Sequence, residues 1–483
     1  DTSDFFYRVG LPTLRVPVHL QVLPFALPAE PTLETIAAVG KCAPEWREAL
    51  RLNLRTHRVS GEGVVAPVPV TVDPWGGVQV NFAEFNAAWR AYFEEAGLRL
   101  FYFPGTAPGD PAAPASAGSW AGLAFSSPLF ERAFPAYVQQ VAAHLRRVGL
   151  LGRAVVRLPD QRVEDATWRQ MCRRLAAFFR EAAPEARIAA AGMPHADLRD
   201  SVDVWVVPFP EGYAAPRLAA ARGKAVWAAE DRLYGLDADT SSIEMRAFPW
   251  RLKRFGASGA EWWSVSYWGP DPSGRPGSWE TQIGGGSLLH LDPTGVTGPV
   301  DTIRWEMYRE GVEDFEVLTL LERAHARVRQ QVGADEPCFA TEALVEWVTR
   351  PVVPSPFETT RDPARLQGAR GVVDALIGFL EAQPPCVLGF AEEGKRLYVV
   401  GAVLPGTEVR NGATALRVDE RGRFRLRAGG DLRLLVRRRG MEKRLACSLA
   451  HLGFRGESET PKRAGDAAGG PSSQLAPPAE EIP

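Results

Sequence analysis

An acidic side chain and an amide side chain stand next to each other where a buried strand is expected to end. The apolar run Ala154–Leu158 predicts this strand, Pro159 ends it, and a helix is expected from about Trp168. Asp160 and Gln161 lie in the turn between the two elements. In α/β proteins, chemistry collects where a strand ends and the chain turns outward into a loop. The pair is therefore the best candidate site in the chain.

The two side chains differ in the chemistry that they can perform. Gln161 can donate a hydrogen bond to a ligand oxygen, but it has no proton to release near neutral pH. Asp160 also has a simpler interpretation as the cap of the following helix, since acidic residues near helix starts are common. Gln161 therefore cannot act as a general acid. Other carboxylates near strand ends could do so: Glu164, Asp165, Glu230 and Asp231.

The composition is that of an ordinary globular protein, with 483 residues, 45% of them hydrophobic and 24% charged. The formal net charge of −2 argues against a nucleic-acid or anionic-membrane partner held by bulk electrostatics. No apolar run approaches the roughly 20 residues that a membrane span needs. The five cysteines form no C-x-x-C motif, and no pair of histidines has metal-ligand spacing. We therefore expect no disulfide framework, no metal and no cofactor.

The elements that position the candidate pair alternate between helix and strand. From about residue 33, strand-like apolar runs are separated by amphipathic helices such as 82–96 and 134–148. Eight strands with helices between them, over roughly 250 residues, predict a (β/α)8 barrel of the TIM type, with an open doubly wound sheet as the alternative. The expected strands are Leu52–Val59, Leu98–Phe103, Ala154–Leu158, Arg187–Ala191, Val202–Val207, Ala225–Ala229, Ala260–Trp268 and Leu288–Leu291.

Four parts are expected along the chain. Residues 1–30 contain a strand segment that is the remnant or the edge of a β-sandwich. Residues 31–384 form the barrel and further helices, and residues 385–452 form a small all-β, sandwich-like module with Gly-rich turns. Residues 453–483, rich in Pro, Ala, Gly, Ser and Glu, cannot bury a core and should be disordered. The fold class is thus α/β, with a small all-β module after the barrel.

Aromatic side chains near the expected strand ends could line a ligand site or pack in the core. For the wall of such a site we favour Trp263 and Trp268, with Tyr267 beside them. Alternation along a strand places Trp262 and Trp263 on opposite faces, so some of these rings must pack against outer helices. Trp205 has the same two interpretations, wall or core.

Two groups of charged residues have both a functional and a structural interpretation. Arg58 lies at the end of the first expected strand, where it could reach a polar substrate or form a structural pair with His57. A later helix carries opposite charges three and four residues apart, which predicts ion pairs on its surface. These residues are Arg304, Glu306, Arg309, Glu313, Asp314 and Glu316.

The order of motifs in the second half of the expected barrel is typical of one enzyme family. Residues 261–268 read Glu-Trp-Trp-Ser-Val-Ser-Tyr-Trp and are followed by Asp271-Pro272 and Leu288-Leu289. Residues 298–316 then read Gly-Pro-Val-Asp-Thr-Ile-Arg-Trp-Glu-Met-Tyr-Arg-Glu-Gly-Val-Glu-Asp-Phe-Glu. This order resembles the catalytic barrel of glycoside hydrolase family 123, which contains β-N-acetylgalactosaminidases. With looser matches at 54–58, 137–149 and 202–205, the resemblance covers about residues 15–330.

The resemblance implies a substrate-assisted glycosidase, a departure from the two-carboxylate mechanism. In that family the 2-acetamido oxygen of the sugar attacks its own anomeric carbon, an Asp orients the acetamido group, and the adjacent Glu protonates the leaving oxygen. The matching residues here are Asp160 and Gln161. The implied ligand is a carbohydrate with a 2-acetamido sugar, a galacto-type β-N-acetylhexosaminide above all, and the implied location is secreted or on the cell surface.

Gln161 departs from the family pattern, because it stands where the proton donor is expected. Loss of a positioned general acid typically costs about 10²–10⁴ in rate. Three explanations are open: the site binds sugar without cleaving it, a neighbouring carboxylate such as Glu230 replaces the acid, or Gln161 is an engineered replacement. Enzymatic activity therefore stays open, and the alternative is a catalytically inactive carbohydrate-binding or surface structural protein on the same scaffold.

Overall fold

The computed structural model describes residues 25–38, 46–62, 68–106, 119–159, 165–208, 223–229, 241–262, 265, 288–291, 299–393 and 396–453. Eight parallel strands form one sheet in the order β2-β1-β12-β11-β10-β9-β8-β5. Their bounds are β1 (Glu34–Ala38), β2 (Ser60–Glu62), β5 (Phe101–Tyr102), β8 (Ala154–Arg157), β9 (Arg187–Ala191), β10 (Val204–Pro208), β11 (Ala225–Ala229) and β12 (Gly259–Trp262).

The two end strands of this sheet lie next to each other, so the sheet is a nearly closed barrel. The Ser60 hydroxyl of β2 accepts hydrogen bonds from the amides of Arg99 and Leu100, just before β5, at 3.2 and 3.0 Å. The Tyr92 hydroxyl joins the same two segments, because it donates to the carbonyls of Gly61 and Leu100 at 2.8 and 2.9 Å. The predicted fold class, a TIM-like barrel rather than an open doubly wound sheet, is confirmed.

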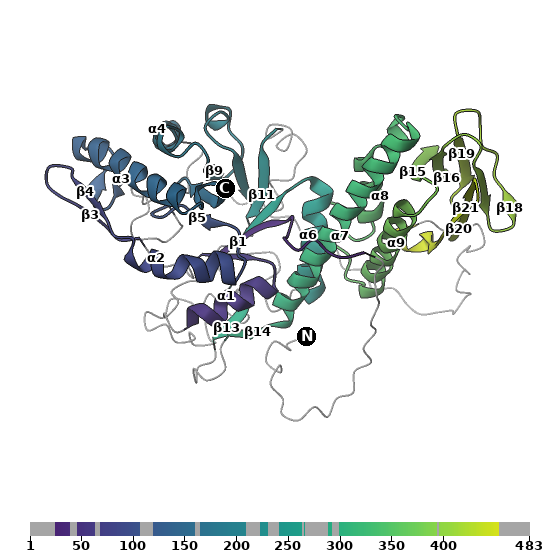
Figure 1. Ribbon diagram of the computed structural model, residues 1–483, viewed down its shortest axis with the longest axis horizontal. Helices are drawn as coiled ribbons and strands as arrows, with labels where there is room; N and C mark the ends of the chain where they lie inside the picture. The colour runs from purple at the N-terminus through teal and green to yellow at the C-terminus, as the bar shows by residue number, and fades with distance from the viewer. Residues whose placement is uncertain are drawn as a thin grey trace, which may run out of the picture.

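Helices surround the barrel (Figure 1). Helix α3 shows why they form where they do: the Ser127 hydroxyl caps its first turn by accepting from the Phe130 amide at 3.1 Å, and Pro128 stands at its first position. Phe130, Phe134 and Tyr137 then bury one helical stripe against the sheet. The barrel helices are α1 (Arg47–Thr56), α2 (Ala83–Arg90) with a π-helical continuation (Ala91–Glu95), α3 (Pro128–Arg147), α4 (Ala166–Ala182), α6 (Ser242–Phe255) and α7 (Ile303–Val332).

Side chains alternate between the barrel interior and the layer under the helices. Val204, Val206 and Trp227 belong to the small interior core, whereas Trp205 and Trp262 belong to the larger core between sheet and helices. The close packing of the barrel interior leaves no room for a side chain at Gly259 of β12. A Cβ atom there would lie 2.4 Å from both the Glu34 carbonyl oxygen and Trp227 Cδ1.

One of the eight predicted strands is a helix and another is a strand outside the barrel, whereas two barrel strands were missed. Residues 52–59 alternate like a strand, but 47–56 form helix α1, because Leu50 and Leu54 bury one helical face while Leu52 is 58% exposed. Strand β13 (Leu289–Leu291) pairs antiparallel with β14 (Pro299–Asp301) outside the barrel. The barrel is completed instead by β1 and β2.

Helix α7 joins the barrel to a second core. Trp305, Tyr308 and Val312 pack in the barrel core, whereas Leu318 and Leu321 pack in a core shared with the C-terminal elements. In Figure 1, α6 and α7 lie between the barrel strands and the C-terminal helices and sheets. Those helices are α8 (Thr341–Thr349) and α9 (Pro363–Glu381).

The charges on α7 follow the surface prediction only in part. Arg309 pairs with Glu306 at 2.9 Å and with Glu313 at 3.3 Å, as helical spacing predicts. Arg304, Asp314 and Glu316 are buried, so the surface interpretation is wrong for them. Glu316 accepts hydrogen bonds from the chain entering β1, and Asp314 binds neighbouring helices.

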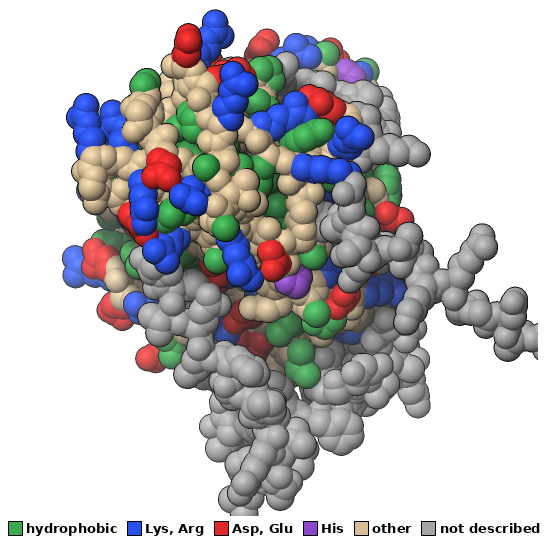
Figure 2. All heavy atoms as spheres, turned by 90° about the vertical axis from the view of Figure 1, so that its right-hand side faces the viewer, with side chains coloured by type: hydrophobic (Ala, Val, Ile, Leu, Met, Phe, Trp, Pro, Cys, Tyr) green, Lys and Arg blue, Asp and Glu red, His purple; other side chains and the backbone are tan. Residues whose placement is uncertain are grey.

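Two antiparallel sheets follow the helices and share their core, as expected for a sandwich-like module. One has the order β15-β16-β19 and the other β18-β17-β20-β21. Charged side chains of both signs are interspersed on this end of the molecule (Figure 2). Arg437 of β20 and Glu442 of β21 form an ion pair at 2.6 Å. The strands are β15 (Cys386–Glu393), β16 (Arg396–Val403), β17 (Glu408–Asn411), β18 (Thr414–Ala415), β19 (Arg423–Arg427), β20 (Asp431–Arg438) and β21 (Met441–Ser448).

The remaining elements are short. They are the hairpins β3 (Val70–Val72) with β4 (Val78–Val80) and β6 (Ser119–Trp120) with β7 (Leu123–Ala124), and the 3-10 turns Leu151–Arg153, Ala196–Leu198, Pro337–Phe339 and Leu449–Leu452. Among the described residues, no helix combines the length and apolarity needed to cross a bilayer. Most of the N-terminal strand segment and nearly all of the C-terminal tail fall outside the described residues.

Candidate active site

The Asp160-Gln161 pair falls between two well-defined elements, although both residues lie outside the part of the chain that the structure describes. Strand β8 ends at Arg157, and the Leu158 amide continues the strand pairing by donating to the Ala189 carbonyl at 2.8 Å. Helix α4 is capped by Asp165, whose carboxylate accepts from the amides of Thr167 and Trp168 at 2.8 and 3.4 Å. The cap is thus supplied by Asp165, which also commits this carboxylate to a structural role.

A buried group of three polar side chains lies inside the barrel at the end of β8. The Arg157 guanidinium donates from Nε to Glu261 Oε2 and from Nη2 to Glu261 Oε1, both at 2.8 Å. The Tyr102 hydroxyl donates to Glu261 Oε2 at 2.6 Å. These residues come from β8, β12 and β5, and each is less than a tenth exposed. The group therefore ties non-adjacent strands together across the barrel.

The electrostatics of this group keep Glu261 ionised. Burial alone would raise the pKa of this carboxyl, but the Arg157 charge and the hydrogen bonds from Arg157 and Tyr102 outweigh it and leave the pKa below its usual range. A bidentate guanidinium–carboxylate pair also fixes the orientation of both planes. Arg157 is thus held rigidly three residues before Asp160. The pair Arg157–Glu261 was not singled out from the sequence, since 104 residues separate its members.

Arg58 and Trp205 are the two predicted substrate-binding residues that the structure describes, and neither lies at the expected mouth of the barrel. Arg58 follows helix α1 and precedes β2, and its Nη2 donates to the Pro28 carbonyl at 2.7 Å. Its predicted role depended on a strand at 52–59, which is a helix, so Arg58 precedes its strand instead of following one. Trp205 is 1% exposed in the core beneath the helices, the position of a core residue.

The other predicted residues, Glu230, Trp263, Tyr267 and Trp268, lie outside the described residues. Their places in the chain are informative: Glu230 directly follows β11, and Trp263 directly follows β12. The carboxyl ends of barrel strands form the catalytic face in TIM-barrel enzymes. Strand assignments on the described residues thus put Glu230 and Trp263 directly after barrel strands, and Asp160 three residues after one.

The architecture defines the class of protein: a TIM-like barrel whose candidate site follows the carboxyl end of its fourth strand, with an antiparallel β-module after it. Within it, residues 118–321 match the family model "Glycoside hydrolase 123, catalytic domain". The matched range contains strands β8 to β12 and the Asp160-Gln161 pair. The resemblance to this family is therefore confirmed over this range.

Solved structures show only distant likenesses. A family 123 glycoside hydrolase from Clostridium perfringens is 13% identical with a TM-score of 0.49, over 74% of this chain and 70% of that one. An endo-β-1,4-mannanase from Thermotoga petrophila is 11% identical with a TM-score of 0.39, over 87% of this chain and 98% of that one. No activity is transferred from likenesses at this level. A comparison with curated proteins found no match.

Proposed function

We propose that this protein acts on or binds glycans with a 2-acetamido sugar, and that β-N-acetylgalactosaminides are its preferred ligands. The observation that carries the proposal is the place of Asp160-Gln161 directly after β8, inside the range that matches the family 123 catalytic domain. The ion pair of Arg157 with Glu261 supports it, because it anchors the end of the strand that precedes the pair in the sequence. A rigid strand end is what a positioned catalytic group requires.

In this proposal, the two side chains have different roles. Asp160 orients the acetamido group so that its oxygen attacks the anomeric carbon, and the carboxylate stabilises the positive charge that develops on the acetamido nitrogen. Gln161 donates a hydrogen bond from its amide nitrogen to the glycosidic oxygen, but it gives no proton. The leaving group must therefore depart as an anion or take its proton from water. Aryl glycosides with acidic phenols should react, whereas alkyl glycosides should react far more slowly.

The first prediction concerns residue 161. Gln161→Glu should raise kcat on a phenyl N-acetyl-β-galactosaminide by about 10²–10⁴, because it restores a proton donor, and by much less on the nitrophenyl glycoside, whose leaving group needs no proton. Steady-state kinetics with both substrates measures this contrast. Gln330→Glu, at an exposed position of α7, is the matched control and should change neither rate. Equal gains on both substrates, or no gain, would contradict the proposed role of residue 161.

Asp160 provides an independent test of the same site. Asp160→Asn should weaken the binding of N-acetylgalactosamine while leaving thermal unfolding unchanged, and calorimetry measures the affinity. Unchanged affinity would contradict the proposed contact with the acetamido group. The expected location, secreted or cell-surface, belongs to the same proposal, since the proposed ligands are glycans.

The amide at position 161 favours a second candidate function, that of a carbohydrate-binding protein without activity. Such a protein would retain 2-acetamido sugars on a glycan array yet turn over no nitrophenyl glycoside, which needs little acid assistance. A surface structural protein, the third possibility, would retain no sugar at all. The three candidates are thus separated by one array and one assay.

A further inference from the structure

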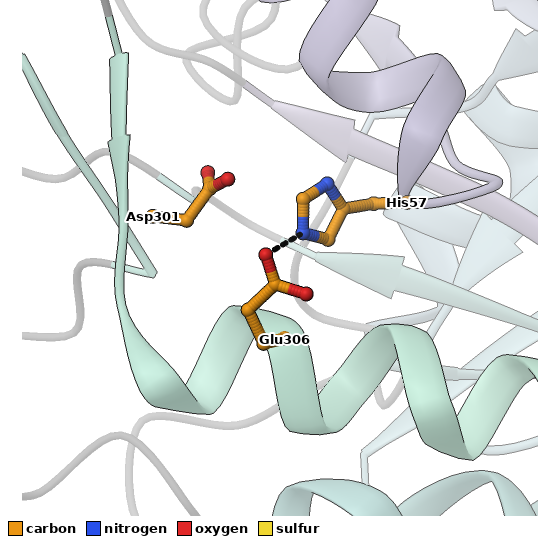
Figure 3. Close-up of side chains that lie close together, drawn as sticks. All are labelled: His57, Asp301 and Glu306. Carbon is orange, nitrogen blue, oxygen red and sulfur yellow. Dashed lines mark ion pairs between the residues drawn. The ribbon is translucent and has the colours of Figure 1, made fainter. Parts of the chain in front are cut away.

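A second cluster of polar side chains lies outside the barrel, between the first and the last barrel helix. His57 follows α1, Asp301 ends β14, and Glu306 stands in the first turn of α7. One ligand-type atom from each, a ring nitrogen or a carboxylate oxygen, lies within 4.8 Å of the other two. In Figure 3 the His57 ring points toward Glu306, and its Nε2 lies 3.8 Å from Glu306 Oε1.

The hydrogen bonds around His57 leave its Nε2 atom facing the cluster without a proton. Nδ1 lies 2.9 Å from the carbonyl oxygen of Asn53, and since a carbonyl only accepts, Nδ1 carries the proton. In the neutral ring Nε2 is then an acceptor, and it is buried with no hydrogen-bond partner among the described residues. The ring is 2% exposed and is stacked on Trp305, with centroids 4.6 Å apart and planes at 16°. Packing therefore fixes the direction in which Nε2 points.

The two carboxylates are oriented in the same way by outer hydrogen bonds. Asn53 Nδ2 donates to Asp301 Oδ1 at 2.5 Å, and the Asn53 amide is itself held by Trp305 Nε1, which donates to Asn53 Oδ1 at 2.9 Å. Arg309 Nε donates to Glu306 Oε2 at 2.9 Å, and Glu306 Oε1 is the oxygen nearer to His57. Each of the three groups thus has one atom held from outside and another free to face the centre.

This arrangement brings three acceptors together with no donor between them. Arg309 compensates part of the negative charge, but it binds Glu306 from the far side. A cation at the centre would satisfy all three acceptors at once. One imidazole with two carboxylates, each supported by an outer hydrogen bond, is a ligand set suited to a divalent transition metal.

We propose that His57 Nε2, Asp301 and Glu306 form a binding site for a divalent transition metal, with Zn²⁺ as the best match. Zn–ligand distances of about 2.0–2.2 Å place tetrahedral ligand atoms roughly 3.4 Å apart. The His57–Glu306 distance of 3.8 Å is already close to this value, and the ligand-type atom of Asp301 lies within 4.8 Å of both. The metal would join the end of α1 to the start of α7, helices from opposite ends of the barrel sequence. The proposed metal site contains neither Asp160 nor Gln161, and its argument does not depend on the proposed function.

The test uses the full chain without a polyhistidine tag, stripped with a chelator and dialysed. Titration with Zn²⁺ against a chromophoric competitor, together with metal analysis after gel filtration, should give one Zn²⁺ per chain with micromolar or tighter affinity. Zn²⁺ should also raise the thermal unfolding temperature, because it binds the folded state. Co²⁺ should give a visible absorption spectrum that Zn²⁺ abolishes. No stoichiometric binding of either metal, or stabilisation by Ca²⁺ and Mg²⁺ alone, would overturn the proposal.

Variants locate the site. His57→Gln and Glu306→Gln should each raise the Kd for Zn²⁺ at least 100-fold, and Asn53→Ala should raise it about 10–100-fold through the lost outer contacts. His195→Gln is the matched control, since His195 lies 3.7 Å from Asp197 in a half-exposed pair, and it should bind Zn²⁺ like the original chain. Glu306 is 28% exposed, so its variant keeps the test valid if His57→Gln fails to fold. Undiminished binding in Glu306→Gln, or equal weakening in the control, would overturn the assignment.

Discussion

At the scale of single residues, the barrel interior holds an ion pair where an apolar side chain would be the simpler solution. Arg157 and Glu261 come from strands on different sides of the barrel, and Tyr102 completes the hydrogen bonding of the carboxylate. A buried ion pair adds little stability relative to apolar packing, but removal of one partner leaves the other charge buried and unpaired. Its value here is in orientation, because it fixes the end of β8 directly before Asp160.

Glu261→Gln should destabilise the protein by about 3–5 kcal/mol, since it leaves the Arg157 guanidinium buried without its counter-charge. Urea unfolding followed by tryptophan fluorescence measures the change. The matched control is Glu185→Gln, which breaks an exposed pair with Arg146 and should have little effect on stability. Similar losses in the two variants would show that the interior pair is not desolvated as the structure has it.

The same pair has a pH dependence with a defined sign. The pKa of Glu261 is lower in the folded protein than in the unfolded chain, so its contribution is fully present above the unfolded value of about 4.3. This contribution is lost only as the pH falls through the lower, folded value. The stability difference between the original chain and Glu261→Gln should therefore shrink on acidification below about pH 4 and stay constant above pH 5.

At the scale of elements, helix α7 connects the two halves of the molecule, because its residues pack in both hydrophobic cores. Its buried Asp314 accepts from Arg246 Nε of α6 at 2.8 Å, from Arg370 Nη1 of α9 at 2.6 Å and from Trp250 Nε1 at 2.9 Å. The Asp314 carboxylate thus connects α7 to α6 and to α9. The contact lies where α7 leaves the barrel core and enters the second core.

Asp314→Asn should cost about 3–5 kcal/mol, because the partly buried guanidinium groups of Arg246 and Arg370 lose the counter-charge of a fully buried carboxylate. Chemical denaturation monitored by circular dichroism measures this loss. Glu381→Gln, which breaks the exposed pair with Arg327, serves as the control and should have little effect. A small effect of Asp314→Asn would show that Asp374, which also pairs with Arg370 at 2.9 Å, replaces it.

The elements also show where sequence patterns succeed and fail. Arg187–Ala191 and Ala225–Ala229 were predicted to the residue, because buried parallel strands read as continuous apolar runs. The strand predicted at 52–59 was wrong, because apolar residues alternate there by chance, whereas Leu50 and Leu54 form the buried face of a helix. Strand β2 could not be recognised, since Ser60-Gly61-Glu62 carries no apolar signal and its place is set by pairing with β1.

Only those parts of the candidate site whose residues are neighbours in the sequence could be predicted from it. Asp160-Gln161 could be found because a strand, a proline and a turn are contiguous in sequence. The pairs Arg157–Glu261 and Asn53–Asp301 could not, because their members are 104 and 248 residues apart and only the folded barrel brings them together. Spacing rules for metal ligands likewise miss this cluster, because His57 is far from Asp301 and Glu306 in the sequence.

At the scale of the whole molecule, the barrel and the β-module are connected through the helices between them. Lys443 of β21 is one such connection: its ammonium is 4% exposed and donates to the carbonyls of Phe379 and Ala382, at the end of α9, at 2.9 and 3.2 Å. It also lies 4.1 Å from the centre of the Phe379 ring. Burial lowers the pKa of Lys443 to about 8. This docking contact therefore contains a charge that the folded protein holds less readily than the unfolded chain does.

The pH dependence of stability follows from that difference. Between about pH 8 and the unfolded lysine value of about 10.4, the unfolded chain binds more protons at residue 443 than the folded protein does, so stability rises with pH. The full change is on the order of 3 kcal/mol, at 1.36 kcal/mol per pKa unit. Lys443→Met removes the titration, and the loss of its two hydrogen bonds is independent of pH. Urea unfolding of both proteins from pH 7 to 10.5 should thus show the original chain gaining stability relative to Lys443→Met across this window. A constant difference would mean that water reaches the ammonium and that the β-module does not seal the end of α9.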